Sequence, residues 1–306
     1  MSLIVFGSLN MDLVAQTPRL PTPGETIQGQ CFFTSPGGKG ANQAVAAARL
    51  GATTYLVGRV GNDAFADELL TGLKADSVDT QQVLVESQTH SGVAMITVNQ
   101  SSENTIIVIA GANGNVDQTD VQRVIPLFSQ ATALLLQLEV PLSAIIAAAK
   151  AAKSAGIKVI LDPAPAPDHL PDELYGLIDI ITPNETEAQR LTGIEITDET
   201  MARKAAEVLL SRGVKTAVIK LGARGVFCLN SSQQFYVEPF PVQAIDTVAA
   251  GDAFNGAMAT ALDRDLSLRE AVIWGAAAGA LATTKLGAQP ALPHWEIFYH
   301  FLHPSA

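Results

Sequence analysis

Short runs of apolar residues, many of them β-branched, alternate with longer alanine-rich stretches over the second half of the chain. The pattern predicts a strand at 133–138, a helix at 142–155, strands at 157–161 and 178–181, a helix at 201–210 and a strand at 214–220. This alternation is typical of βαβ units, which build a parallel sheet. An apolar run at 3–7, with no basic segment before it, predicts a buried first strand and no secretion signal.

The order differs in the first third of the chain. The segments 26–33, 93–98 and 105–109 read as strands without crossover helices, and the polar run 99–103 predicts a turn between the last two. These strands are unusually apolar for exposed edges. We therefore expect a small inserted β-sheet that covers something, as a lid, as a dimer face or as both.

Length and composition favour one large domain. The 306 residues are 48% apolar, and no repeat or Ser/Gly-rich linker divides them. We expect a single α/β domain over residues 1–306, with lid strands at about 12–36 and 92–110.

Charge and the apolar stretches argue against two kinds of partner. The net charge of −11, from 30 acidic and 19 basic residues, disfavours sequence-independent binding of nucleic acid. The stretch Ala271–Ala282 is shorter than the roughly 18 apolar residues that a membrane span needs, so it predicts a core helix and no membrane anchor. Cys31 and Cys228 form no CxxC pair and the five histidines form no HExxH motif, which is expected of a reduced, cytoplasmic enzyme without a zinc site.

Loops that follow the predicted strands are the places to search for a site, because ligands of open parallel sheets bind beyond the carboxyl ends of the strands. The first such loop, 7–12, puts Asn10 and Asp12 on one face if the backbone stays extended; both are also turn formers, so a plain turn is the alternative. In the second, 36–42, three glycines surround Lys39 ahead of a helical run. This loop is not a Walker A sequence, and it favours a close approach of the backbone to a ligand over a flexible connection.

Two later loops carry carboxylates at predicted helix starts. Asn184 and Glu187 have nearly the spacing of a helix capping box, and the alternative is a pair that orders water around a divalent cation. Asp252 follows three tiny residues at 249–251, six residues after Asp246. Small residues at a helix start leave consecutive amides free to bind an anion, so this segment predicts a site of phosphate transfer.

Taken together, these segments resemble the ribokinase branch of the ribokinase-like (PfkB) carbohydrate kinases. The motifs GSLNMD, RLPTPGET, GGKGANQAVAAARLGA, LLQLEVP, NETEA and DTVAAGDAFNGA occur in family order from residue 7 to about residue 293. The resemblance implies a three-layer α/β/α domain with a mostly parallel central sheet. It also implies a small inserted β-sheet lid that usually forms a homodimer contact, and the use of ATP and Mg²⁺.

The resemblance also implies a role for each matching residue. Asp252 would be the base that takes the proton of the attacking primary hydroxyl, and the backbone amides of Ala249, Ala250, Gly251 and Asp252 would form an anion hole. The hydroxyls of the sugar would be held by Asn10, Asp12, Gly38, Lys39, Asn42, Glu139 and Asp252.

The remaining implied roles concern the nucleotide and the cations. Asn184 and Glu187 would organise Mg²⁺ and the phosphates, Glu187 through water, while Lys220 and Gly222 would line the nucleotide. Relatives of this branch are commonly activated by K⁺, and many carry Ser where this chain has Ala291, so no hydroxyl ligand can form there. The positions that match the K⁺ site are Asp246, Val248, Ala282, Lys285, Gly287 and Ala291.

The expected activity is ATP-dependent phosphorylation of a primary hydroxyl of a sugar, with D-ribose as the first candidate and D-ribose 5-phosphate as the product. Other substrates of the same chemistry stay open: 2-deoxyribose, fructose or a nucleoside, for which Phe32 and Phe33 could supply apolar contacts or simply form lid core. A non-catalytic sensor of a sugar or nucleotide is the alternative of another class. The intact segment 249–252 favours catalysis.

Overall fold

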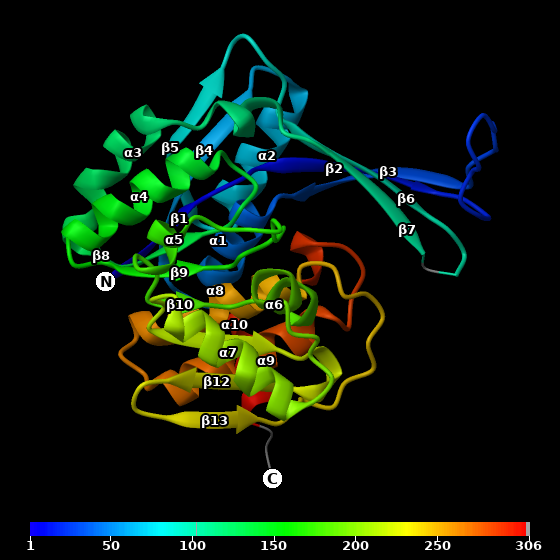
Figure 1. The fold of residues 1–306 in the computed structure, drawn as a ribbon. Helices are drawn as coiled ribbons and strands as arrows, with labels where there is room; N and C mark the ends of the chain where they lie inside the picture. Colours follow the sequence, from blue (N-terminus) through cyan, green and yellow to red (C-terminus); the bar gives the residue numbers. More distant parts are fainter. Residues whose placement is uncertain (102, 304–306) are drawn as a thin grey trace.

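The computed structural model describes residues 1–101 and 103–303, and within them a large nine-stranded sheet forms the centre of the fold (Figure 1). Seven adjacent strands of this sheet run parallel, and the two strands at one edge continue it in antiparallel pairs. In spatial order the strands are β13 (Gln234–Val237), β12 (Val226–Asn230), β11 (Thr216–Lys220), β10 (Ile180–Ile181), β9 (Lys158–Leu161), β8 (Ala131–Leu136), β1 (Ser2–Phe6), β4 (Thr53–Gly61) and β5 (Val78–Glu86).

Helices cover both faces of this sheet, which gives the expected three layers. The first strand shows why, because Leu3 and Val5 join one apolar core and Ile4 and Phe6 join the other. The first core is closed by α1 (Lys39–Arg49), α2 (Ala64–Ala75), α8 (Ala250–Asp263), α9 (Leu268–Ala282) and α10 (Trp295–Leu302). The second is closed by α3 (Gln118–Val124), α4 (Leu142–Ser154), α5 (Asp172–Tyr175), α6 (Glu185–Thr192) and α7 (Glu199–Ser211).

A second, smaller sheet projects to one side of the main domain (Figure 1). Its spatial order is β3 (Cys31–Gly37), β2 (Asn10–Gln16), β6 (Gly92–Val98) and β7 (Asn104–Ile109). Large apolar side chains stay exposed on it, among them Phe32, Met95 and Ile107, the last at 63%. The small sheet is therefore present as expected, and it exposes an unusually large apolar area to solvent.

Some predicted boundaries are wrong. The strand expected at 26–33 runs from Cys31 to Gly37, because pairing with β2 begins where Cys31 lies opposite Gln16. The helix after the glycine loop starts at Lys39, so the loop is shorter than expected. A turn follows β6 as expected, with Asn99 Oδ1 accepting from the backbone N–H groups of Ser101 and Glu103; Ser102 lies outside the described residues.

The alanine-rich stretch Ala271–Ala282 forms most of α9, and α9 packs on α8 in the core as expected. Across residues 1–101 and 103–303, the longest apolar helices are too short to span a bilayer. In the described part of the chain there are also four short 3₁₀ turns: η1 (Gly111–Asn115), η2 (Ile125–Gln130), η3 (Gly222–Arg224) and η4 (Gln289–Ala291).

Candidate active site

The glycine loop is pressed against the segment that follows β1. Gly38 has a φ of +89°, and a Cβ on it would lie 2.6 Å from the backbone nitrogen of Asn10. A Cβ on Gly40 would lie 2.6 Å from the backbone nitrogen of Ser8, whose carbonyl accepts from Ala41 N–H at 2.9 Å. At these two positions the expected close approach of the backbone is therefore to another loop of the chain, and it locks the two candidate segments together.

Asn10 lies in β2, so the extended reading of this segment is correct and the turn reading is wrong. Its side chain is fixed on both sides: Oδ1 accepts from Asn113 Nδ2 at 2.8 Å, and Nδ2 lies 3.5 Å from Glu139 Oε2. The same carboxylate oxygen of Glu139 accepts from Lys39 N–H at 3.1 Å and from Ser8 Oγ at 2.5 Å. Residues from four separate parts of the sequence thus form one polar cluster.

Asp12 faces this cluster from the same strand. Burial, together with the negative charges of Glu139 and Asp252, raises the pKa of its carboxyl to about 7. A Cβ on Gly37 would lie 2.6 Å from Asp12 Oδ2, so a larger residue at this position would displace the carboxyl group. The carboxyl groups of Asp12, Glu139 and Asp252 therefore lie close enough to act on one another electrostatically.

Lys39 is the cation at the centre of the site. Burial opposes its protonation, but four carboxylates outweigh burial and raise its pKa above the usual range. The side chain therefore stays charged at neutral pH. The four carboxylates are those of Asp252, Asp162, Glu139 and Glu187.

Asp252 lies in the first turn of α8 and is 5% exposed. Its Oδ2 accepts from Asn42 Nδ2 at 2.9 Å and its Oδ1 from Gln43 Nε2 at 3.1 Å. Burial raises the pKa of this carboxyl, while the charge of Lys39 and the two amide hydrogen bonds oppose the rise. The two amide hydrogen bonds hold the Asp252 carboxyl group in one position, and a general base needs such fixed placement.

The helix start beside Asp252 has the geometry of an anion site. Ala249 adopts a left-handed conformation with φ of +58°, and α8 begins at the next residue. Ala250 N–H turns towards Thr247 O at 3.3 Å, whereas the amides of Gly251 and Asp252 occupy first-turn positions that have no acceptor within the helix. Two of the four expected amides are thus directed for anion binding by helix geometry alone.

Lys220, at the end of β11, has its ammonium group next to the start of α8. Its Nζ would be 3.2 Å from a Cβ on Gly251 and forms an ion pair with Asp162 Oδ1 at 3.0 Å. Its backbone N–H donates to Pro183 O at 2.9 Å, which brings the start of α6 alongside. Gly222 follows in η3 with φ of +54°.

Asn184 and Glu187 form a complete capping box at the start of α6. Glu187 accepts from Asn184 N–H with one carboxylate oxygen and from Asn184 Nδ2 with the other, at 2.8 and 2.9 Å. Burial raises the pKa of Glu187, and the positive charge of Lys220 opposes the rise. Each oxygen of a carboxylate keeps a second lone pair, so the box leaves Glu187 able to bind the water of a hydrated Mg²⁺.

The candidate cation loop is held together by Asp246. One of its oxygens accepts from Gly287 N–H at 2.9 Å and the other from Val248 N–H at 3.0 Å. Of the other matching positions, Ala282 ends α9, Lys285 lies in the loop after it and Ala291 ends η4. These contacts bring Asp246, Val248 and Gly287 together, and the fully aliphatic side chain of Ala291 is buried.

Several polar residues of the site are not predicted from the sequence motifs. Asp162 and Gln137 follow β9 and β8, so the rule of strand carboxyl ends would have found both. Gln43 stands inside the glycine-loop motif and reads as an ordinary helix residue. Ser8 contacts Glu139 and Asn113 contacts Leu9, and no local sequence pattern predicts either contact.

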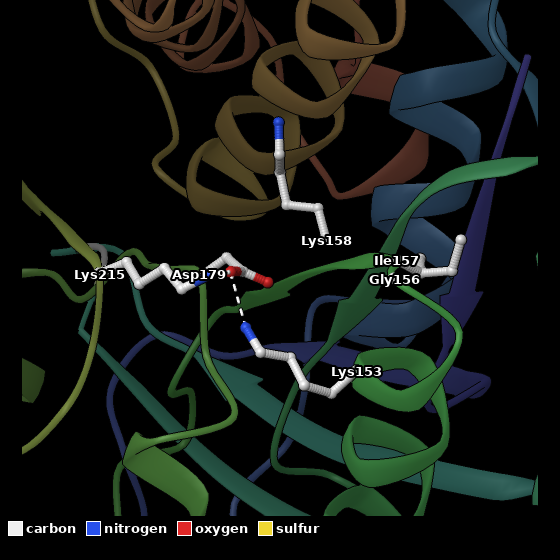
Figure 2. Close-up of a pocket in the computed structure, with 6 residues that line it drawn as sticks. All are labelled: Lys153, Gly156, Ile157, Lys158, Asp179 and Lys215. Atoms are coloured by element: carbon white, nitrogen blue, oxygen red, sulfur yellow. Dashed lines mark hydrogen bonds and ion pairs between the residues drawn. The ribbon is translucent and has the colours of Figure 1, made fainter.

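A separate hollow of about 250 Å³ lies at the amino ends of β9, β10 and β11, opposite the candidate site (Figure 2). Asp179 is its centre and forms ion pairs with Lys153 at 2.8 Å and with Lys215 at 2.7 Å. Figure 2 shows that Lys158 points away from Asp179. The lining residues are Lys153, Gly156, Ile157, Lys158, Asp179 and Lys215.

The three-layer fold has close counterparts among carbohydrate kinases. Residues 1–295 match the pfkB family of carbohydrate kinases. The ribokinase of Haemophilus influenzae is 46% identical over 301 residues, 98% of each chain, and the deoxyribokinase of Salmonella typhi is 36% identical over 306 residues, 99% of each chain. The solved structure of Arabidopsis thaliana ribokinase complexed with ribose and ATP has a TM-score of 0.91 at 35% identity and 99% coverage of both chains. The chain belongs to the pfkB family of carbohydrate kinases.

Proposed function

We propose that this chain transfers the γ-phosphoryl group of ATP to the primary hydroxyl of D-ribose and forms D-ribose 5-phosphate. The observation that carries the proposal is the buried Asp252 carboxylate, held by Asn42 and Gln43 beside the free amides of a helix start. The relatives named ribokinase, and the solved ribokinase that binds ribose and ATP, support the choice of substrate.

The proposed reaction uses Asp252 as the base. As the hydroxyl oxygen of the sugar bonds to the γ-phosphorus, its proton passes to Asp252, the bond from phosphorus to the bridging oxygen breaks, and ADP leaves. Phosphoryl transfer depends on positioning and on stabilisation of charge, which the amides of Gly251 and Asp252 and the ammonium of Lys220 would supply. The anion hole would also include the amides of Ala249 and Ala250.

The sugar would bind in the cluster beside β2. Carboxylates accept hydrogen bonds from hydroxyl groups in fixed directions, and Asp12 and Glu139 would be the acceptors. A sugar that lacks one hydroxyl leaves a buried partner unpaired, which is how such a site would select ribose over 2-deoxyribose. The full proposed set is Asn10, Asp12, Gly38, Lys39, Asn42, Glu139 and Asp252.

The nucleotide would lie on the other side of Asp252. Asn184, Glu187, Lys220 and Gly222 approach one another there, and a hydrated Mg²⁺ would hydrogen-bond through its water to Glu187. Bound with ATP, Mg²⁺ neutralises charge on the phosphates. We also propose a K⁺ site on the Asp246 loop, with Val248, Ala282, Lys285, Gly287 and Ala291 as the matching positions.

A homodimer is the proposed assembly, formed through the small sheet, which would serve as the lid. The exposed apolar side chains of β3, β6 and β7 would then be covered by a second copy. The use of ATP and the unpaired Cys31 and Cys228 favour the cytoplasm.

An assay of ADP release over pentoses, hexoses and nucleosides, with and without K⁺, tests the function. We expect ribose to give the highest kcat/KM, 2-deoxyribose a value about tenfold or more lower, and K⁺ to stimulate turnover. Activity confined to another substrate would keep the kinase and overturn the choice of ribose. Sugar binding without ADP release would instead favour the sensor.

A further inference from the structure

Gln43 lies between two buried aspartates. Its single amide nitrogen donates to Asp252 Oδ1 at 3.1 Å and to Asp162 Oδ2 at 3.0 Å. The three side chains are almost completely buried, at 1%, 5% and 2% exposure for Gln43, Asp252 and Asp162. One NH₂ group thus bridges two carboxylates that would otherwise face each other in a region of low dielectric.

A second glutamine, together with the two aspartates, orients this amide. Gln43 Oε1 accepts from Gln137 Nε2 at 2.7 Å, and Gln137 is fully buried. A flipped Gln43 would point its oxygen at both aspartates and its NH₂ group at the Gln137 donor, so every contact would become repulsive. Only one orientation of the Gln43 amide is therefore compatible with its surroundings.

The bridge also connects the two halves of the site. The other oxygen of Asp162 is paired with Lys220 Nζ at 3.0 Å, and that ammonium lies beside the α8 start. A continuous chain of contacts thus runs from Gln137 through Gln43 and Asp162 to Lys220, with Asp252 as a branch from Gln43.

We propose that Gln43, oriented by Gln137, is a positioning residue: it holds the carboxylate of Asp252 in line with the attacking hydroxyl and keeps it bridged to Asp162. The inference rests on the proposed role of Asp252 as the base. Gln43 positions and polarises the base, and it does not contact the sugar.

The electrostatics of the site set the direction of the expected effect. The charge of Asp162 raises the pKa of Asp252, and the Gln43 hydrogen bond lowers it. Without the Gln43 amide, the repulsion between Asp162 and Asp252 remains, but the hydrogen bond that offsets it is lost. The pKa of Asp252 therefore rises, and the base is protonated at a higher pH. The charged groups that act on this part of the site from the surrounding elements are Lys39, Asp12, Asp162, Glu139, Glu187 and Lys220.

The test is Gln43→Met, which keeps the length of the side chain and removes its hydrogen bonds. We expect kcat at pH 7 to fall about 10- to 100-fold, KM for the sugar to change less than about threefold, and the acid limb of the pH profile of kcat to move up by about one unit. Gln137→Met should move the same limb in the same direction by less. The double variant should be no worse than Gln43→Met alone, because both act through one amide.

Thr260→Val is the matched control. Thr260 is buried at the contact of α8 with α1, two turns beyond Asp252, and its hydroxyl donates to Gly256 O at 2.8 Å. Loss of this bond should lower thermal stability and leave the acid limb in place, which separates a structural defect from a positioning defect.

Each outcome has one meaning. A Gln43→Met enzyme whose acid limb matches the parent overturns the inference, and so does a loss carried by KM alone. If Gln43→Met does not fold, Gln137→Met decides, and an unmoved limb in that variant overturns the inference as well. Asp252→Asn separates the role of the base from that of Gln43: if it keeps full turnover, the role of Asp252 as the base fails and this inference fails with it, whereas if it is inactive while both glutamine variants match the parent, only this inference fails. The proposed function itself fails only if the parent releases no ADP with ribose.

Discussion

The two ends of β9, β10 and β11 carry the same chemistry in two different settings. At the carboxyl ends Lys220 is paired with Asp162, and at the amino ends Lys153 and Lys215 are paired with Asp179. Each end has lysines, an aspartate and an ion pair shorter than or close to 3.0 Å. Residue types alone therefore do not distinguish the candidate active site from the hollow in Figure 2.

The two ends differ in how deeply the charged side chains are buried and in how many hydrogen-bond partners each carboxylate already has. The side chains of Lys220 and Asp162 are 13% and 3% exposed, whereas Lys215 is 65% exposed. At the carboxyl ends, glycines remove steric bulk and bring separate segments into contact, and a helix start adds free amides. At the amino ends, the carboxylate is already satisfied, because Asp179 also accepts from Val159 N–H. The cluster at the carboxyl ends is buried and has free amides beside it that could bind a ligand. The cluster at the amino ends is exposed, and its carboxylate already has its hydrogen-bond and ion-pair partners.

The strongest test of this contrast is Asp252→Asn. The substitution keeps the shape of the side chain and removes its ability to accept a proton, so kcat should fall about 10²- to 10⁴-fold. Binding of the sugar should change little, since the amide has the size of the carboxyl group and its oxygen can still accept a hydrogen bond from Asn42 or Gln43. Steady-state kinetics and calorimetric titration with ribose measure the two quantities. A variant with turnover within a few-fold of the parent would refute the assignment of the base.

A second test uses the raised pKa of Asp12. Burial and two neighbouring carboxylates raise this pKa to about 7, so the folded state binds the proton more tightly than the unfolded chain does. The stability contributed by this group is therefore fully present below about pH 4 and is lost as the pH rises towards 7. Asp12→Asn should remove this component, and the decrease of Tm between pH 5 and pH 8 should become smaller than in the parent.

The same substitution should affect catalysis in the opposite sense. At pH 8 the parent offers an ionised acceptor to the sugar, and the variant offers a weaker, neutral one, so kcat/KM should fall about 10- to 100-fold, mainly through KM. The paired comparison of Tm and KM over pH checks both statements. An unchanged KM at pH 8 would remove Asp12 from the sugar site.

The sequence predicts the fold class well because period-2 and period-3.6 patterns are local. Leu3 to Phe6 alternate between two cores, and the helix at 142–155 matches α4 (Leu142–Ser154) within one residue. The strand expected at 26–33 fails because its limits depend on pairing with β2, which lies 15 residues earlier at the first matched pair. Pairing partners that are distant in sequence leave no local signal.

The candidate site shows the same division. Residues in compact motifs, such as Asn42 and Asp252, are identified from the sequence, and the structure brings them within hydrogen-bond distance. Asn113 takes part in three hydrogen bonds with the segment around Asn10, yet it lies more than 100 residues away and stands in no motif. Its role depends on where η1 packs, which is a property of the tertiary structure.

The smallest expected effect is at the amino ends of the strands, where Lys215→Met serves as the counterpart of Lys220→Met. Lys215 is largely exposed and shares Asp179 with Lys153, so its loss should cost less than about 1 kcal/mol of stability and leave kcat and KM within about twofold of the parent. Added salt should shrink the difference further, because exposed pairs are screened. Lys220→Met should instead lower turnover at least about tenfold, since it strips Asp162 of its cation inside a buried cluster. Equal effects of the two substitutions, in either direction, would show that burial does not separate these two ends.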